Sequence, residues 1–131
     1  MFRRHERLKR FTDGFGANDE RVSPIFKTNF HTFYYSFLVG VAAGERANDI
    51  SGAKDMIDYF PENFRETKNQ IIAVLIHTYT NELGMKLDDK QSLKKMVSGL
   101  INVEARQLSS EGYKRVNEYA YHGFEIIEKN I

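Results

Sequence analysis

The segment from Pro24 to Gly44 constrains the fold more than any other part of the chain. It contains four of the ten phenylalanines and two of the seven tyrosines, and it ends in glycines and alanines. Each large ring can bury roughly 150 to 250 Å² of surface. The segment must therefore pack against something, and the choice lies between the rest of this chain and a partner.

Size and composition favour one domain. The chain has 131 residues, of which 41% are hydrophobic and 28% are charged, and it has no cysteine. A chain of this length buries well over half of its unfolded surface without metals or disulfides, and the lack of cysteine excludes thiolate chemistry. The longest nearly apolar stretch, 33–43, is about eleven residues long, whereas a membrane-spanning helix needs roughly 20. We therefore expect a cytoplasmic protein with no membrane span.

Apolar side chains recur at helical spacing in four segments, each with a cap or a terminating glycine. No alternation of period two is long enough to require a sheet, although a small strand near Ile50 or Leu87 is compatible with the pattern. The sequence predicts an all-α fold, a compact bundle of four main helices. The expected helices run from Asn29 to Ala43, from about Pro61 to Leu83, from Asp88 or Asp89 to Leu108, and from Ser109 or Ser110 onward.

Positive charge is concentrated at the amino terminus. Five cations against Glu6 give the first ten residues a charge of +4, which leaves −3 for the rest of a chain whose total is +1. We expect residues 1–20 to form a basic arm and loop, with a short helix over 2–11, and residues 21–131 to form one helical domain. The cations can contact a DNA phosphate backbone or simply keep the protein soluble. The candidate nucleic-acid-binding residues are Arg3, Arg4, Arg7, Lys9 and Arg10.

The aromatic helix has two interpretations. As the centre of a core it matches the apolar stripes of the other three helices. As an interface it has a surplus of rings, since Phe26, Phe30 and Tyr35 fall partly off the main stripe. Gly40 and Gly44, four residues apart, would let another helix approach closely. These five residues are the candidate interface for a partner protein or for a second copy of the chain.

No motif in the chain identifies a reaction. The four histidines stand singly on different expected elements, and neither an HExxH nor a Glu-x-x-His pair is present. No serine lies in a Gly-x-Ser-x-Gly elbow. Gly14-Phe15-Gly16 lacks the third glycine and the lysine of a phosphate-binding loop. We therefore expect no catalytic residue, no metal and no cofactor; a hidden hydrolase or metal enzyme would need a pocket with converging polar groups.

Two parts of the chain carry a resemblance to a known family. The first is Ile25-Phe26 followed by Phe33-Tyr34 and the run FLVGVAAGER that ends at Arg46, and the second is the run YAYHGFEII over 119–127. They resemble the small helical accessory proteins of bacterial DNA phosphorothioation (Dnd) and related phage-defence systems. That family has an arginine pair where this chain has Arg46 alone, and an Asn-Gly where this chain has Tyr121-His122.

The resemblance implies a non-catalytic partner of larger DNA-modifying or DNA-cleaving proteins. We therefore expect a small helical subunit of a bacterial anti-phage defence or DNA-modification complex, which acts by protein–protein assembly and touches DNA, if at all, through the amino-terminal arm. The alternative is a self-assembling DNA-binding module that uses the arm, and its affinity would fall steeply with salt.

Overall fold

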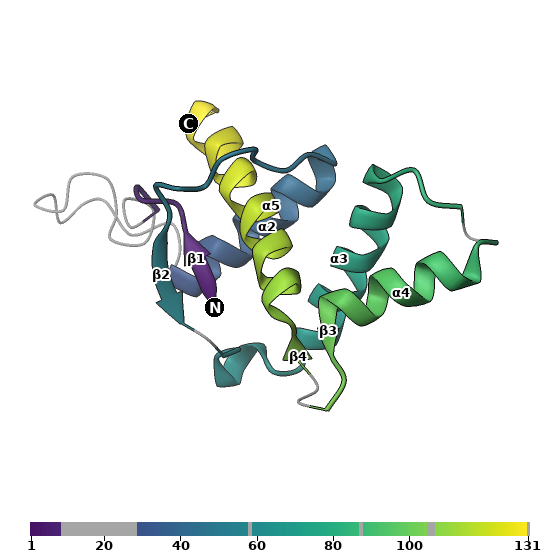
Figure 1. Ribbon diagram of the computed structural model, residues 1–131. Coiled ribbons are helices and arrows are strands. Elements are labelled where there is room, and N and C mark those ends of the chain that lie inside the picture. The colour runs from purple at the N-terminus through teal and green to yellow at the C-terminus, as the bar shows by residue number, and fades with distance from the viewer. Residues whose placement is uncertain (9–28, 58, 87, 105–106, 131) are drawn as a thin grey trace, which may run out of the picture.

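The computed structural model describes residues 1–8, 29–57, 59–86, 88–104 and 107–130 (Figure 1). This part of the chain is mostly helical, but the expectation of an all-α fold is wrong in one respect, because four short strands form two antiparallel pairs. None of the helices in these ranges combines the length and the apolar character needed to cross a bilayer. In chain order the elements are β1 Phe2–Arg4, α2 Asn29–Ala43, β2 Lys54–Ile57, the 3-10 helix η1 Glu62–Phe64, α3 Lys68–Glu82, α4 Lys90–Leu100, β3 Ile101–Asn102, β4 Gln107–Leu108 and α5 Ser110–Lys129.

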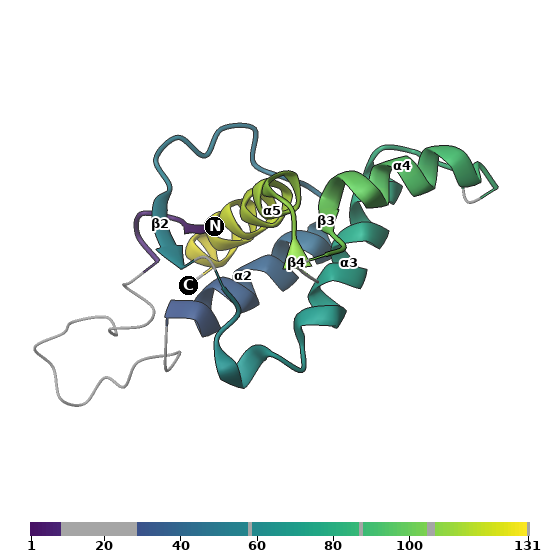
Figure 2. The same ribbon diagram turned by 60° about the horizontal axis from the view of Figure 1, so that its bottom comes forward.

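Helices α2 and α5 cross at the centre of the molecule (Figures 1 and 2). Glycines make the close crossing possible. A Cβ atom added at Gly123 of α5 would lie 2.6 Å from the backbone nitrogen of Gly40 and closer still to the carbonyl oxygen of Ser36. A Cβ added at Gly40 would likewise overlap the carbonyl group of Tyr119. Two helix backbones in direct contact leave no room for a side chain at either glycine.

The first strand completes the core. Strand β1 pairs with β2, and the Phe2 ring is fully buried, with ring centres 4.9 to 5.4 Å away in Phe30, Phe33, Phe60 and Tyr113. The expected helix over 2–11 is therefore wrong at its start. The extended backbone is held on both sides, since Arg3 donates its backbone N–H to the side-chain oxygen of Asn117 on α5. Residues 9–11 lie outside the described part.

The first and fourth helices confirm the predictions from sequence. Helix α2 has the expected bounds, and Gly44 follows it with a φ of 71° while donating its N–H to the carbonyl of Gly40. Of the two serines proposed as the cap of the last helix, Ser109 is the one that accepts the N–H of Gly112. Asp89 caps α4 in the same way, by accepting from Ser92.

The second and third helices are shorter than predicted. The second divides into η1 and α3, which begins at Lys68. The third ends at Leu100 because Ile101 is extended and starts the hairpin of β3 and β4. Ser109 fixes this end, since its hydroxyl donates to the carbonyl of Gly99 and its N–H donates to the carbonyl of Leu100. One serine therefore closes α4 and opens α5.

Candidate functional site

Two cations of the arm, Arg3 and Arg7, are held by the rest of the domain. Arg3 pairs with Asp55 at 3.1 Å and also donates to the carbonyl of Ala53. Arg7 makes two hydrogen bonds, of 2.7 and 2.8 Å, to the two carboxylate oxygens of Glu128 near the end of α5. Arg4 donates to the backbone carbonyl of His5; Lys9 and Arg10 lie outside the described residues. The positive charges of Arg3 and Arg7 are therefore already neutralised by carboxylates of the domain, which lowers their attraction for phosphate.

His5 anchors the arm to α5. Its ring is buried and lies against the rings of Tyr121 and Phe124, with centres 4.3 and 4.6 Å apart. Its Nδ1 atom accepts the backbone N–H of Arg7. Burial lowers the pKa of His5, although the carboxylate of Glu6 opposes that effect. A proton on Nδ1 would displace the hydrogen bond from Arg7. The stability of the fold therefore depends on the protonation state of His5.

The free energy of unfolding is expected to decrease as the pH falls below about 6.5. The pKa of His5 in the native state lies below its ordinary value of 6.5, so between these two values the unfolded chain binds more protons. The contribution of His5 is therefore complete above pH 6.5 and declines as the pH falls toward its native pKa. Urea unfolding at pH 7.5 and pH 5.5 measures the difference, and we expect it to be smaller in His5→Gln.

His77→Gln is the matched control for that experiment, because His77 is exposed on α3. It should keep the wild-type difference between the two pH values. The lower pH is chosen above the range in which Glu6 and Glu82 take up protons, since both have a pKa below the ordinary 4.5. An unchanged difference in His5→Gln would assign the pH dependence to other groups.

The five candidate interface residues divide between the interior and the surface. Phe30 is buried between Phe2 and Phe64, with ring centres 5.2 and 4.6 Å away, and Gly40 contacts α5 of its own chain. The expectation that these two residues face a partner is therefore wrong: both are occupied inside the monomer. Gly44 serves as the end of α2, and Phe26 lies outside the described part.

Tyr35 remains on the surface, with 48% of its area exposed. Leu38 is 37% exposed, and Ala42 is exposed one turn further on. The three residues follow each other at spacings of three and four, so they form one stripe along α2 on the side away from the core. We call Tyr35, Leu38 and Ala42 the outer stripe of α2.

A cluster of charges joins α5, α3 and the segment after α2. Arg46 binds Glu82 at 2.9 Å and Glu118 at 2.9 Å. Arg115 binds the same carboxylate of Glu118 at 2.7 Å, and the Tyr119 hydroxyl donates to Glu82. The guanidinium groups of Arg46 and Arg115 also lie 5.1 and 5.4 Å from the centre of the Tyr79 ring, as in cation–π pairs. The Arg46 cluster consists of Arg46, Tyr79, Glu82, Arg115, Glu118 and Tyr119.

The electrostatics of the Arg46 cluster favour a structural role. Burial raises the pKa of Glu82, but hydrogen bonds from Tyr119 and Arg46 outweigh burial and bring that pKa below its ordinary value. Burial and the Glu82 carboxylate raise the pKa of the Tyr119 hydroxyl well above 10. The Glu82 carboxylate is thus held ionised, and the Tyr119 phenol is held protonated. A carboxylate that is kept ionised by a cation is a weak base, and a phenol that is kept protonated is a weak nucleophile.

Arg46→Ala is expected to lower the free energy of unfolding by about 1 to 2 kcal/mol, since two carboxylates lose a charged donor while Arg115 still holds Glu118. Urea denaturation at pH 7 measures the change. The control is Arg65→Ala, at an exposed position. It should change the free energy of unfolding by less than about 0.5 kcal/mol. Equal effects of the two substitutions would show that the cluster adds nothing to stability.

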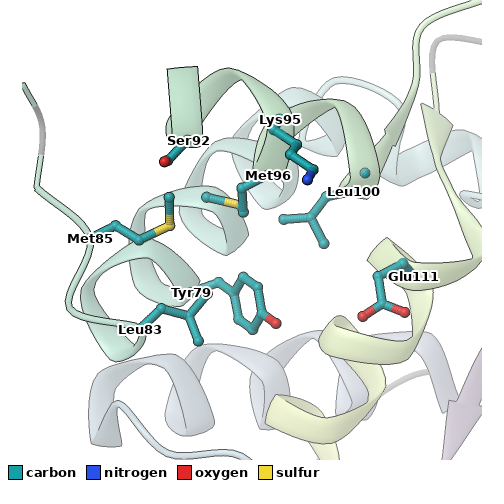
Figure 3. A pocket seen from close by; sticks show the side chains of 9 residues that line it. Tyr79, Leu83, Met85, Ser92, Lys95, Met96, Leu100 and Glu111 are labelled. Carbon is teal, nitrogen blue, oxygen red and sulfur yellow. The ribbon is translucent and has the colours of Figure 1, made fainter. Parts of the chain in front are cut away.

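Two hollows adjoin α4, on either side of its line of contact with α3. The first, of about 390 Å³, is lined mainly by apolar side chains, among them Met85, Met96 and Leu100. Figure 3 shows these side chains converging with Tyr79 and Leu83, while the charged groups of Lys95 and Glu111 lie at the edge. The second, of about 440 Å³, is lined by Ala73, Ile76, His77, Thr80 and Asn81 of α3 and by Leu93 and Val97 of α4. We call the second hollow the α3–α4 groove.

The two hollows exist because α4 is only partly covered by the rest of the described chain. Leu93, Met96 and Val97 form the expected apolar stripe, but each is only half-buried, and Leu100 is the one residue of α4 that is fully buried. The pair of α3 and α4 lies to one side of α2 and α5 in both views (Figures 1 and 2). No set of three histidine, aspartate or glutamate side chains within the described ranges is placed to hold a metal ion.

No protein-family model, curated protein or solved structure matches this chain. The resemblance to phosphorothioation accessory proteins therefore stays a prediction. The described parts of the two segments that carry it are in contact, because Gly40 of the first contacts Tyr119 of the second, and Arg46 of the first binds Glu82, which accepts the Tyr119 hydroxyl. These residues hold α2 and the segment after it against α3 and α5.

Several of these residues gave no recognisable signal in the sequence. Glu118 could have been found, since a carboxylate beside Tyr119 within a stripe of buried positions needs a cation, and Arg115 lies one turn before it. The burial of His5 and Phe2 had no such sign. The ring partners of His5 lie more than a hundred residues away on α5, and those of Phe2 are spread over α2, α5 and the segment before η1.

Proposed function

We propose that this protein is a non-catalytic helical subunit that assembles, in the cytoplasm, with a larger protein of a bacterial anti-phage defence or DNA-modification complex. The observation that carries the proposal is the outer stripe of α2. Tyr35 and Leu38 are exposed on a helix whose opposite side forms the centre of the core, and α2 carries no charged residue. A rigid, uncharged helix face with an exposed tyrosine has the composition of an interface core.

The Arg46 cluster supports assembly over catalysis. Its charges are paired among themselves, and it forms the joint that fixes α2 and the segment after it against α3 and α5. A helix held on its inner side by this joint and by the Gly40–Gly123 crossing is preorganised, so binding on its outer side costs little ordering entropy.

The test is co-expression with the products of neighbouring genes, followed by size-exclusion chromatography with light scattering. We expect a stable complex with wild-type protein and its loss in Tyr35→Glu and Leu38→Glu. Tyr59→Glu is the control, because Tyr59 is also an exposed tyrosine and belongs to the segment between β2 and η1, not to α2. A monomer that binds none of the neighbouring proteins, or a complex that tolerates both α2 substitutions, would refute the proposal.

DNA binding through the arm is the alternative. The ion pairs of Arg3 with Asp55 and of Arg7 with Glu128 weigh against it, because at each position a carboxylate neutralises the cation and repels a phosphate. The alternative requires an affinity that falls steeply with salt and drops when Arg3, Arg4, Arg7 and Arg10 become alanine. Affinity that is unchanged by these substitutions removes it.

A further inference from the structure

We propose that the α3–α4 groove is a docking site for an acidic amphipathic helix of a partner protein. The groove is built as helix-binding grooves are, with apolar side chains from two neighbouring helices on its walls. Ile76 of α3 and Leu93 and Val97 of α4 supply these walls, and the small side chain of Ala73 leaves space between them. Leu93 and Val97 are half-buried in the described chain, so a third helix would complete their burial.

The charge around the groove specifies the partner. Helix α4 contains Lys90, Lys94 and Lys95 and no acidic residue. In helical geometry Lys90 and Lys94 border the side of α4 that carries Leu93 and Val97, whereas Lys95 borders the other side. None of the residues that line the groove is a carboxylate. An apolar helix face flanked by glutamate or aspartate therefore complements both the walls and the edge.

The same charges argue against a second copy of this chain as the occupant. A two-fold contact through the groove would place Lys90 and Lys94 near the equivalent lysines of the other copy. Helix α2 has an exposed apolar stripe, but it has no carboxylate to offer these lysines. On α5, Glu111, Glu118 and Glu128 are already paired with arginines of their own chain. The apolar face of α5 is moreover buried in the core of its own chain and is not available to a groove. The occupant is thus a different protein.

The groove and the outer stripe of α2 lie on different elements, so the inference goes beyond the proposed function and can fail or succeed independently of it. Substitutions in the groove leave Tyr35 and Leu38 untouched. A partner held at both surfaces would gain affinity from the second contact by effective concentration.

The experiment uses the full chain and a labelled synthetic peptide of about 15 residues, which is near the shortest length for a helix of measurable population. The peptide has leucines at helical spacing and glutamates on both flanks. A second peptide has lysine in place of every glutamate. Fluorescence anisotropy should show the acidic peptide binding at least about tenfold more tightly than the basic one, since attraction becomes repulsion at two lysines.

The variant that tests the edge is Lys90→Glu with Lys94→Glu, and the matched control is Lys86→Glu with Lys95→Glu. Both pairs change the net charge equally at exposed positions. The Lys90/Lys94 variant should lower the affinity for the acidic peptide about tenfold, and the control variant should lower it less than about threefold. Amide chemical shifts should change at Ala73, His77, Leu93 and Val97 on binding. Absence of binding, equal binding of the two peptides, equal effects of the two variants, or shifts confined to α2 or to the hollow at Met85 and Met96 would each overturn the proposal.

Discussion

Gly123→Ala is expected to lower the free energy of unfolding by about 3 kcal/mol or more, the upper range for overpacking a core. The added methyl group would overlap the backbone of α2 at Ser36 and Gly40. Backbone atoms within a helix cannot move aside as the end of a flexible side chain can. The two helices must therefore separate, and the rings packed around their crossing lose contacts.

Urea denaturation followed by circular dichroism measures this loss, and Gly99→Ala is its matched control. Gly99 lies in α4, and a Cβ atom there would meet nothing within 4 Å. The same substitution should therefore stabilise the protein by up to about 1 kcal/mol, because alanine favours a helix over glycine. If Gly123→Ala lowers the free energy of unfolding and Gly99→Ala raises it, the loss arises from the helix crossing. A small effect of Gly123→Ala would mean that α2 and α5 do not pack at this distance.

Phe2→Ala is expected to cost about 3 to 5 kcal/mol of stability, as for other buried aromatic side chains. Phe2 is fully buried, and its ring makes edge-on contacts with four others that come from α2, α5 and the segment before η1. Such contacts add to the stabilisation that burial alone provides. Removal of the ring leaves a cavity where these elements meet, so the loss should be cooperative.

Thermal and urea unfolding of Phe2→Ala and of Tyr59→Ala separate this contribution from a general effect of losing a ring. Tyr59 is 61% exposed, and its substitution should change stability by less than about 0.5 kcal/mol. Phe2→Leu should recover part of the loss, because it refills most of the volume. Wild-type stability in Phe2→Ala would mean that β1 is not part of the folded core.

The sequence predicted α2 correctly because every signal for it is local. The apolar spacing, the uncharged run and Gly44 just past the end all lie within the helix or one residue beyond it. The end of α4 depends instead on hydrogen bonds from Ser109 to Gly99 and Leu100. Ile101 and Leu108 fit the helical spacing equally well, so the pattern alone could not distinguish a longer helix from a hairpin.

The distinction between local and distant signals also applies to the candidate site residues. The positive charges of the arm could be counted, but their partners could not be known, since Asp55 is 52 residues from Arg3 and Glu128 is 121 residues from Arg7. Gly40 was correctly expected to permit a close helix approach. The approaching helix is α5 of the same chain, which the spacing of small residues cannot specify.

The crossing of α2 and α5 also sets the order of events during synthesis. Helix α2 ends at Ala43 and α5 begins at Ser110, so a ribosome adds roughly 70 residues between them, which takes about 3 to 14 seconds. Throughout that interval Phe33 and Phe37 have no partner helix to cover them. The nascent chain thus passes through a stage in which its most aromatic segment is exposed, and a chaperone has those seconds in which to bind it.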